Sequence, residues 1–327
     1  MTEPDQNKKA LEYLISRLKE EGTVTDPYQV RLHENQGYMS SVSILSSGFG
    51  EFILHISQPT PEHIHQKTWE KLKAITDLFR DNPAVPVAKM HIAERFENVF
   101  ITAQTRLSGV PAGKRIINNA TVADEWFADT QSLSQQILSA LAKIHDNKFL
   151  GYGVPIVING KLQGKYKSWR EFFQEEIPIW IKSVRKADAR LGYENLSEKL
   201  ETFRENVLKE IPETEPALIH GDIINPSNIL VKDGKITGIL DWEWSLMGDP
   251  AWEFAMYGWE PVIRSTGLEP YFRARGITAV EKKKEFLDRT KLYWPLWCLW
   301  GAHLHAEDED SFVYDTLRKW LYNCLHI

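Results

Sequence analysis

The sequence predicts an α+β fold of two lobes, in which a small antiparallel sheet is followed by a larger, mainly helical lobe. Short β-type runs separated by turn residues cover 29–57, a helical pattern follows over 62–80, and a strand run covers 97–107. After Gly109 apolar residues recur at helical spacing to the end of the chain, interrupted by one hairpin. We therefore expect an N-terminal lobe over 1–106, a C-terminal lobe over 107–327, and a ligand in the cleft between them.

The first lobe is expected to open with an amphipathic helix, because four apolar residues recur at helical spacing: Leu11, Leu14, Ile15 and Leu18. The runs "SVSIL" and "EFILHIS", separated by "SSGFG", predict a hairpin within 29–57. A second helical pattern covers 62–80 and ends before the breaker "DNPAVPV". The run "ENVFITAQTRL", 97–107, predicts a strand that leads out of the lobe.

The second lobe is predicted to be helical from Gly109 onward, with a helix that ends near His145. Further helices are expected over Trp169–Val184 and Leu196–Ile211, and the segment after Pro250 continues as helices with aromatic faces. Most of the twelve Trp residues should lie in the core or in a pocket wall, because an indole buries a large area and keeps one donor.

Composition excludes several classes of function. The 327 residues, 43% of them apolar, can bury a large core, and a net charge of -6 argues against general nucleic-acid binding. Cys298 and Cys324 lack metal-ligand spacing, which fits a reducing cytosol. The sequence contains no signal-peptide or membrane-span pattern, so we expect a cytoplasmic protein without a membrane partner, possibly a monomer.

The stretch "ALIHGDIINPSNILVKDGKITGILDWEWSLMGDP", 217–250, combines a strand, a loop and a hairpin. Asp233 and Gly234 favour a two-residue type I′ turn. With these two residues as the loop, the expected pairs are Leu230 with Thr237 and Asn228 with Ile239. On that register Asn228 and Asp241 share one face of the ribbon as diagonal neighbours, roughly 7 Å apart.

This pairing indicates a metal site beside a catalytic acid. Amide and carboxylate oxygens from Asn228 and Asp241 suit a hard ion such as Mg²⁺, which takes its other ligands from water and phosphates. Asp222 ends its own strand and could accept the proton of an attacking hydroxyl, which completes the arrangement that kinases use for phosphoryl transfer. Each residue alone also fits ordinary turn chemistry, but the ordered set favours function.

The motifs "HGD", the following Asn, "LDW" and "GDPAWEFA" resemble the aminoglycoside phosphotransferase family, relatives of the protein kinases. The likeness covers nearly the whole chain. "GYG" at 151–153, Trp169 with Phe172, and "ILDWEWSLMGD" and "YGWEP" are most similar to the hygromycin B phosphotransferase branch. The resemblance implies a protein-kinase-like fold with a nucleotide-binding N-lobe, a catalytic and substrate-binding C-lobe, and ATP or GTP with Mg²⁺ as cofactors.

The same resemblance implies the roles of the polar residues. Asp222 would be the catalytic base, and Asn228 and Asp241 the magnesium ligands. Asp249 would hold its loop, and Glu253 would pack structurally. His220 is expected to orient the loop through hydrogen bonds, because no second His stands at metal-ligand spacing.

The loop that follows Asp222 departs from the family pattern. Five residues separate Asp222 from Asn228, where the family usually has four. Either the loop bulges or the metal is held differently. Asn225 is the competing ligand, and the expected hairpin register favours Asn228.

A second departure concerns the cation that holds nucleotide phosphates. The family usually places Lys or Arg in the strand "EFILHIS", where this chain has His55. A neutral imidazole lacks the permanent charge that suits a polyphosphate. Lys67 on the next helix is a possible substitute, and Glu70 is the expected acid partner of the cation.

The remaining nucleotide contacts are predicted from position. The loop 33–41 would cover the phosphates, with Gly37 and the hydroxyls of Ser40 and Ser41. The adenine would contact the connecting strand at Gln104, Thr105 and Leu107, mainly through backbone groups.

The acceptor is expected against a wall formed by Trp242, Glu243, Trp259 and Glu260, since acids and aromatic faces suit a polyhydroxylated cation. The first hypothesis is a kinase of an aminoglycoside such as hygromycin B, which would confer antibiotic resistance. The alternatives are a metabolic kinase of choline or a sugar, and an inactive nucleotide-binding protein.

Overall fold

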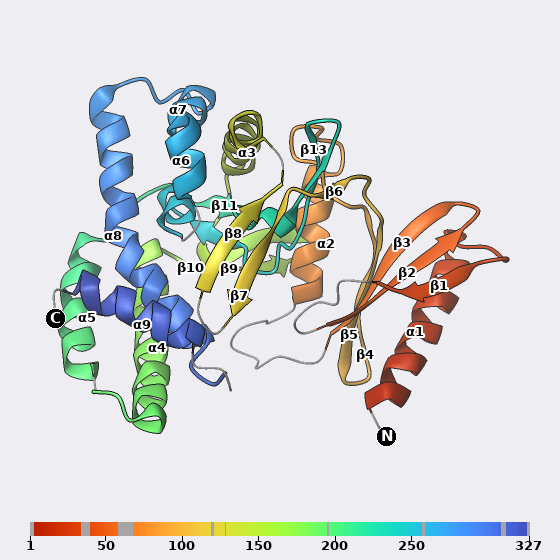
Figure 1. Ribbon diagram of the computed structural model, residues 1–327, viewed down its shortest axis with the longest axis horizontal. Helices are drawn as coiled ribbons and strands as arrows, with labels where there is room; N and C mark the ends of the chain where they lie inside the picture. Colours follow the sequence, from red (N-terminus) through yellow and green to blue (C-terminus); the bar gives the residue numbers. More distant parts are fainter. Residues whose placement is uncertain are drawn as a thin grey trace.

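A computed structural model describes residues 3–33, 40–57, 68–118, 121–127, 129–194, 196–256, 259–308 and 312–325. In Figure 1 the small sheet lies on the right and the helices of the second lobe lie on the left. The N-terminus belongs to the sheet side and the C-terminus to the helical side.

The sheet of the first lobe is antiparallel, with the strand order β1-β2-β3-β5-β4. Its strands are β1 (Gln29–Leu32), β2 (Ser40–Ser47), β3 (Gly50–Ser57), β4 (Met90–Phe96) and β5 (Val99–Thr105). The predicted hairpin and connecting strand are confirmed as β2–β3 and β5. The sequence reading missed β4, which pairs with β5 along its length.

Two helices accompany this sheet. The predicted opening helix is α1 (Glu3–Glu20), which buries Leu14 and Leu18 in a cluster with residues of β3, β4 and β5. The helix expected over 62–80 is α2 (Thr68–Phe79), and residues 58–67 lie outside the described part of the chain. Ile75 and Phe79 of α2 belong to the larger core, so this helix connects the two lobes.

The prediction of helix directly after Gly109 is wrong for residues 110–126. Here the chain forms β6 (Val110–Pro111) and an antiparallel ribbon of β7 (Gly113–Asn118) and β8 (Thr121–Trp126). Opposite charges face each other across this ribbon, Lys114 with Glu125 and Arg115 with Asp124, and such cross-strand pairs stabilise a sheet.

A second unexpected hairpin joins β9 (Tyr152–Ile158) and β10 (Lys161–Tyr166). Its turn contains Asn159 and Gly160, both with positive φ, as a type I′ turn requires. With β11 (Ala217–Ile219) and β14 (Leu246–Gly248) these strands form the sheet β10-β9-β14-β11. Strands β12 (Ile229–Lys232) and β13 (Lys235–Ile239) pair with β6 in a third sheet.

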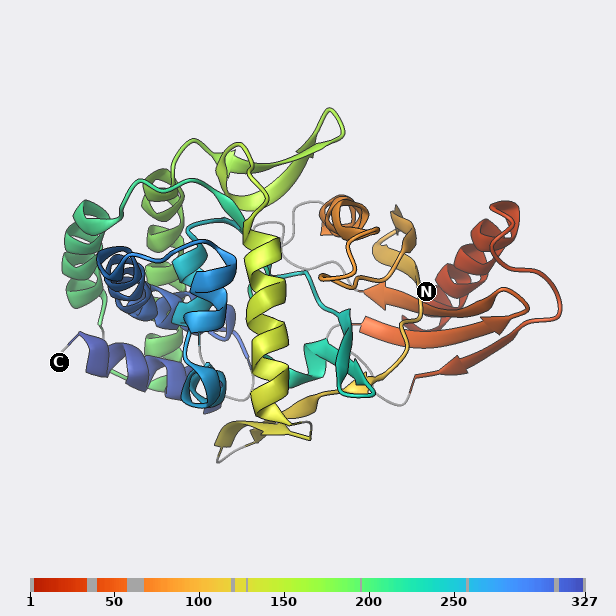
Figure 2. The ribbon, with the colours of Figure 1, turned by 90° about the horizontal axis from the view of Figure 1, so that it is seen from above.

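Helices make up the rest of the second lobe: α3 (Thr130–His145), α4 (Trp169–Leu191), α5 (Ser197–Glu210), α6 (Glu260–Thr266), α7 (Glu269–Ala274), α8 (Val280–Leu304) and α9 (Phe312–Cys324). Two short 3₁₀ helices complete it, η1 (Pro226–Asn228) and η2 (Pro250–Ala255). In Figure 2 α3 runs between the other helices and the part of the molecule that holds the small sheet.

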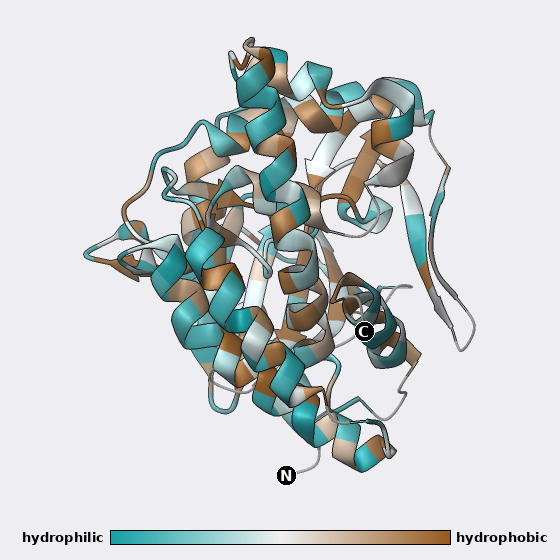
Figure 3. Ribbon diagram, turned by 90° about the vertical axis from the view of Figure 1, so that its left-hand side faces the viewer, coloured by the Kyte–Doolittle hydropathy of each residue, from teal (hydrophilic) through white to brown (hydrophobic). Residues whose placement is uncertain are grey.

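The buried side chains form one small cluster under the first sheet and one large cluster in the helical lobe. Hydrophobic and hydrophilic residues alternate along the outer helices in Figure 3, as expected of helices with one buried face. The fold is thus α+β, with an N-terminal five-stranded antiparallel sheet and a mainly helical remainder, and the boundary after residue 106 remains a proposal. None of the described helices is long and apolar enough to cross a membrane.

Candidate active site

One buried acid holds the loop after β11 through hydrogen bonds to its backbone. Glu253 of η2 is fully buried, and its carboxylate accepts hydrogen bonds from the backbone N–H of His220 (2.7 Å) and of Gly221 (3.2 Å). Gly221 has φ +89°, and a Cβ there would lie 2.2 Å from the carbonyl oxygen of Trp244. The loop therefore requires glycine at this position, and Glu253 fixes the direction in which Asp222 leaves it.

His220 holds the same loop from the other side. Its Nδ1 lies 3.2 Å from the Asp222 backbone N–H, and its Nε2 lies 2.9 Å from the carbonyl oxygen of Leu240. Accepting at Nδ1 and donating at Nε2 requires the neutral ring with its proton on Nε2. Burial lowers the pKa of His220, which favours that neutral form. The orienting hydrogen bonds expected for His220 are present.

The carboxylate of Asp222 is held by three donors. Its Oδ2 accepts from Nδ2 of Asn225 (3.1 Å) and from Nδ2 of Asn228 (3.0 Å). Its Oδ1 accepts from Arg115, with an N–O distance of 2.9 Å. Asp222 retains 17% side-chain exposure and lines a cavity, so it can meet a small molecule.

Arg115 comes from the β7–β8 ribbon, more than 100 residues away in sequence. Its guanidinium binds both carboxylate oxygens of Asp124, at 2.8 and 3.2 Å, and uses its remaining terminal nitrogen for Asp222. Burial disfavours the charged guanidinium, but the hydrogen bonds and charges of Asp124 and Asp222 outweigh burial and raise the pKa of Arg115. A fixed positive charge therefore stands beside Asp222.

The expected hairpin register is wrong near the loop. The turn at Asp233 and Gly234 forms as predicted, but a bulge between Leu230 and Val231 shifts the pairing, so that Leu230 faces Gly238 and Ile229 faces Ile239. Asn228 lies in the 3₁₀ turn η1, directly before β12 begins.

The extra loop residue is accommodated by this 3₁₀ turn. Asn225 caps it by accepting from the backbone N–H of Ser227, and Asn228 reaches back to Asp222. Asn225 and Asn228, the two competing metal ligands, therefore both touch Asp222.

Asp241 follows β13 in a left-handed backbone conformation, with φ +59°. Burial raises the pKa of Asp241 to about 7, and the negative charges of Glu243 and Asp222 add to this, while Lys71 opposes it. The side chains of Asp241 and Glu243 keep contact with solvent. Asp222, Asp241 and Glu243 thus concentrate negative charge in one region.

Lys71 of α2 meets this acidic region from the other lobe. The residue is 3% exposed, and its Nζ donates to the carbonyl oxygen of Glu243. Burial lowers the pKa of Lys71 to about 8, and the charges of Glu243 and Asp241 act in the opposite direction. Lys71 also lines a cavity of about 50 Å³ together with Glu243 and Trp244.

The acidic region fits a magnesium ion that is shared with a nucleotide. In the described part of the chain no three His, Cys, Asp or Glu side chains are arranged to hold a metal by themselves. Mg²⁺ usually takes one or two protein carboxylates and completes its shell with water and phosphate oxygens. Asp241, whose ionised form is disfavoured first by burial and then by neighbouring negative charge, is a side chain that a divalent cation would stabilise.

Asp249 occupies a structural position, in line with its expected role. It is fully buried, and its Oδ2 accepts from Nε of Arg289 (2.6 Å) and from the hydroxyl of Tyr293 (2.9 Å). Its Oδ1 caps η2 by accepting from the Ala251 backbone N–H. Asp249 therefore ties the loop after β14 to α8.

Two of the predicted nucleotide residues lie in the first sheet and α2. His55 is half-buried in β3, and burial together with the charge of His33 lowers its pKa to about 4. His55 is therefore neutral near pH 7. Glu70 is half-exposed on α2 and precedes Lys71. The sequence reading selected Lys67 and Glu70 on this helix, whereas the structure brings Lys71 to Asp241.

The other predicted nucleotide residues lie at the end of β5, directly after it, at the start of β2, or outside the described part. Gln104 and Thr105 end β5 opposite Ile53 and Phe52, and Thr105 contacts His91. Leu107 follows and packs near Gly238. Ser40 begins β2 with only its backbone described, and Gly37 and Lys67 lie outside the described residues.

The predicted acceptor wall is distributed differently from expectation. Trp242 is 3% exposed and packs between Phe79 and His220, and Trp259 is 2% exposed and donates to the Glu253 carbonyl. Neither lines the cavity at Asp222. Glu243 faces the smaller cavity beside Lys71, and the side chain of Glu260 lies outside the described part.

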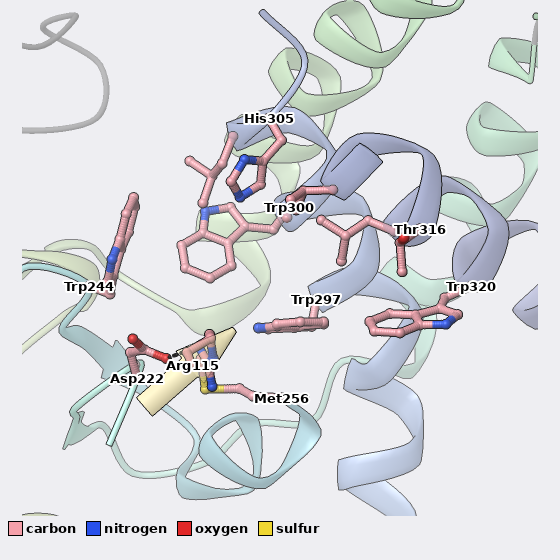
Figure 4. Close-up of a pocket in the computed structure, with 14 residues that line it drawn as sticks. Arg115, Asp222, Trp244, Met256, Trp297, Trp300, His305, Thr316 and Trp320 are labelled. Atoms are coloured by element: carbon pink, nitrogen blue, oxygen red, sulfur yellow. Dashed lines mark hydrogen bonds and ion pairs between the residues drawn. The ribbon is translucent and has the colours of Figure 1, made fainter. Parts of the chain in front are cut away.

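A cavity of about 170 Å³ opens directly at Asp222 and Arg115. Figure 4 shows its indole walls, with Trp244 near Asp222, Trp300 and Trp297 in the middle, and Trp320 at the far side. Asp222 stands at one end of an aromatic chamber.

The sequence reading missed the residues that complete this site. Arg115 was hidden in a segment predicted to be helical, and the helical aromatics of α8 and α9 were assigned only generally to core or pocket wall. A signal for the ribbon existed, since "KRIIN" and "TVADEW" carry β-branched residues and opposite charges at matching positions.

We expect Arg115→Ala to reduce kcat about tenfold to hundredfold, since a charge-assisted hydrogen bond is worth about 1.5–3 kcal/mol and here it orients the Asp222 carboxylate. The measurement is steady-state phosphotransfer with a parallel nucleotide titration, in which the nucleotide Kd should stay unchanged. Lys114→Ala is the matched control, because Lys114 lies on the same strand as Arg115 but forms an exposed ion pair with Glu125. An equal loss of kcat in both variants would contradict a specific role of Arg115 in the site.

A model of the phosphotransferase enzyme family matches residues 35–286. The uncharacterized protein YcbJ of Bacillus subtilis (strain 168) is 42% identical over 41 residues, which is 12% of this chain and 13% of that protein.

Solved structures resemble this chain over most of its length. The aminoglycoside phosphotransferase APH(4)-Ia aligns with a TM-score of 0.68 and 16% identity over 98% of each chain. A thermostable mutant of that enzyme, in a ternary complex with ADP and hygromycin B, aligns at 0.64 and 16% over 94% of this chain and 96% of that one. Macrolide 2′-phosphotransferase type I aligns at 0.59 and 15% over 98% of each chain. At such identities the likeness is one of fold.

Proposed function

The chain belongs to the phosphotransferase enzyme family, and from this premise we propose that it transfers the γ-phosphoryl group of ATP or GTP to a hydroxyl group of a small molecule. The observation that carries the proposal is the position of Asp222. Its carboxylate is oriented by Arg115, Asn225 and Asn228, and it faces a cavity large enough for a small acceptor.

Asp222 acts on the acceptor hydroxyl. A carboxylate that accepts several fixed hydrogen bonds keeps one geometry, so the attacking oxygen meets its proton acceptor in a defined direction. The proton passes from the hydroxyl to Asp222 as the oxygen attacks the γ-phosphorus, and Arg115 lies close enough to offset negative charge at that end. Phosphoryl transfer depends mainly on such positioning and charge stabilisation.

Mg²⁺ would be held by Asp241 with Asn228, and it would neutralise the phosphate charge that develops during transfer. Asn225, which shares the contact with Asp222, is the alternative amide ligand. Both amides reach the same carboxylate oxygen, so a shift of one side chain would exchange the role.

Lys71 supplies the cation for the nucleotide phosphates in this proposal. His55 stands where the family usually has Lys or Arg, and its lowered pKa leaves it uncharged. Lys71 reaches the acidic region from α2 and lies near Asp241, where the phosphates and the metal would meet. A lysine displaced from strand to helix would therefore perform the same electrostatic task.

The acceptor predicted from the sequence is an aminoglycoside such as hygromycin B, with antibiotic resistance as the consequence. Support comes from the ligand of one solved relative of this fold and from the net charge of -6, which would attract a polycation. A metabolic alcohol is the alternative, and the aromatic cavity favours it. A nucleotide-binding protein without activity is the third candidate, favoured by the missing strand cation at His55.

A test of nucleotide binding distinguishes a nucleotide-dependent enzyme from a protein that uses this fold for another purpose. We expect Mg-ATP at 100 times its Kd to raise the melting temperature by roughly 5 °C, because ligand binding adds about 2.7 kcal/mol to the native state. ATP with EDTA should give a smaller shift, since Asp241 would then face the phosphates without a metal. Absence of any shift with Mg-ATP or Mg-GTP would contradict the proposed function.

A further inference from the structure

The cavity at Asp222 limits the size of what it can enclose. A cavity of about 150 Å³ in an engineered protein holds one benzene, and the present cavity has a volume of about 170 Å³. One ring therefore fills the enclosed space. An acceptor with several sugar rings would leave most of its body in solvent.

The walls of the cavity are apolar and nearly neutral. Four indoles, from Trp244, Trp297, Trp300 and Trp320, line it, and the side chains of Met256, Leu304, Val313 and Leu317 add further apolar surface. Among the described residues that line it, Asp222 is the one carboxylate. Asp222 is already paired with the guanidinium of Arg115, which repels ammonium groups. The described residues of this lining therefore offer a polycation no further acidic partner.

One polar group in the wall has no partner. The buried Nε1 of Trp297 makes no hydrogen bond within the described part of the chain. In Figure 4 the nitrogen end of Trp297 faces the side of the cavity where Asp222 and Arg115 lie. A buried indole N–H usually finds a partner, and leaving it unpaired costs free energy. The nitrogen has almost no accessible surface, so a ligand oxygen would satisfy it after a small shift of the side chains that cover it.

We propose that the acceptor of this site is a compact alcohol with a single apolar ring and one further oxygen, rather than a polycationic aminoglycoside. The ring lies among the indoles, the second oxygen accepts from Trp297 Nε1, and the reacting hydroxyl points to Asp222. In the transfer step the hydroxyl oxygen bonds to the γ-phosphorus, the bond to the nucleoside diphosphate breaks, and the hydroxyl proton goes to Asp222. This inference rests on the proposed phosphotransfer and names its acceptor class.

The test uses cyclohexylmethanol and the 2-yl and 4-yl isomers of tetrahydropyranylmethanol, in which a ring oxygen replaces one CH₂. Binding is measured by ligand-observed NMR without nucleotide, and phosphate transfer is measured with Mg-ATP. Hygromycin B and choline are the competing acceptors. We expect at least one ring alcohol to bind and to exceed hygromycin B and choline at least tenfold in kcat/KM.

Trp297→Phe removes the N–H and keeps an aromatic ring. We expect it to lower the affinity ratio of the better tetrahydropyran isomer to cyclohexylmethanol about fivefold. Trp126→Phe is the matched control, because Trp126 also has a buried, unpartnered Nε1 but does not line the cavity. The ratio should not change in this control.

Two results would overturn the acceptor class: hygromycin B or choline equal to or better than the ring alcohols, or no ring alcohol bound. An unchanged affinity ratio in Trp297→Phe would overturn the role of the indole N–H. Ring alcohols that bind as described but yield no phosphate ester would instead refute the proposed function and leave the binding inference in place. Phosphorylation of hygromycin B without any binding of ring alcohols would refute the binding inference and leave the proposed function in place.

Discussion

Asp222→Asn is expected to lower the phosphotransfer rate by about 10²- to 10⁴-fold, the usual contribution of a positioned general base. The amide keeps the shape of the side chain, and Arg115 keeps both of its contacts to Asp124, so the loop should stay folded. What is lost is the group that receives the acceptor's proton. The measurement is kcat from ADP release, with Mg-ATP affinity followed by calorimetry.

The control for this prediction is Asp233→Asn in the β12–β13 turn. Asp233 is exposed and has φ +53°, a conformation that Asn also adopts readily, so the same chemical change there should leave activity within about twofold. If Asp222→Asn turned over as fast as the unaltered protein, Asp222 could not be the base. A loss of Mg-ATP binding in Asp222→Asn would place the residue in the nucleotide site instead.

Lys71→Met should weaken Mg-ATP binding by about tenfold to hundredfold, because one charge-assisted hydrogen bond to phosphate contributes about 1.5–3 kcal/mol. Methionine preserves the apolar stem that packs in the interior, so the loss should come from the charge. The neutral His55 offers no replacement for that charge. The measurement is the Kd of Mg-ATP by calorimetry, with folding checked by the melting temperature in the absence of ligand.

Lys73→Met provides the matched control for Lys71. Lys73 lies on the same helix, but its side chain faces solvent and pairs with Asp77. Its substitution should leave the Kd unchanged within about twofold. An unaltered Kd in Lys71→Met would show that another group holds the phosphates, whereas an equal loss in both variants would indicate a general effect of charge on α2.

Much of the fold followed from hydrophobic periodicity. Long amphipathic helices such as α1 and α4 have repeating apolar faces, and these predict them well. The β7–β8 ribbon does not carry an apolar alternating face that periodicity would detect, because its described cross-strand pairs are charged: Lys114 and Glu125 are exposed, whereas Arg115 and Asp124 are largely buried. The β9–β10 hairpin did carry a usable signal, the Asn159-Gly160 pair after β-branched residues, but this hairpin was not predicted.

The loop that holds Asp222 was the part of the candidate site that the sequence indicated most directly. "HGD" and the strand end before it point to Asp222 as the proposed base, because a short contiguous motif can be recognised without knowledge of tertiary structure. The hairpin argument that chose Asn228 used a register that the bulge at Leu230 and Val231 invalidates. A bulge depends on how β12 fits between β6 and β13, and this contact lies outside the local sequence.

The residues that the sequence could not supply come from distant elements. Arg115 reaches Asp222 across 107 positions, and the indoles of Trp297 and Trp320 come from two different helices. These side chains meet at the cavity because of the way the helices and the ribbon pack together. Hydrophobic periodicity predicts single elements and does not specify that packing.

The measurement that tests the central claim most directly is ³¹P NMR of the protein with Mg-ATP and the ring alcohols, hygromycin B and choline. We expect a new phosphomonoester resonance and ADP with the unaltered protein, and neither when Mg²⁺ is chelated or Asp222 is replaced by Asn. Binding of Mg-ATP without any new phosphomonoester across all of these acceptors would contradict the account, as would an ester formed equally well by Asp222→Asn.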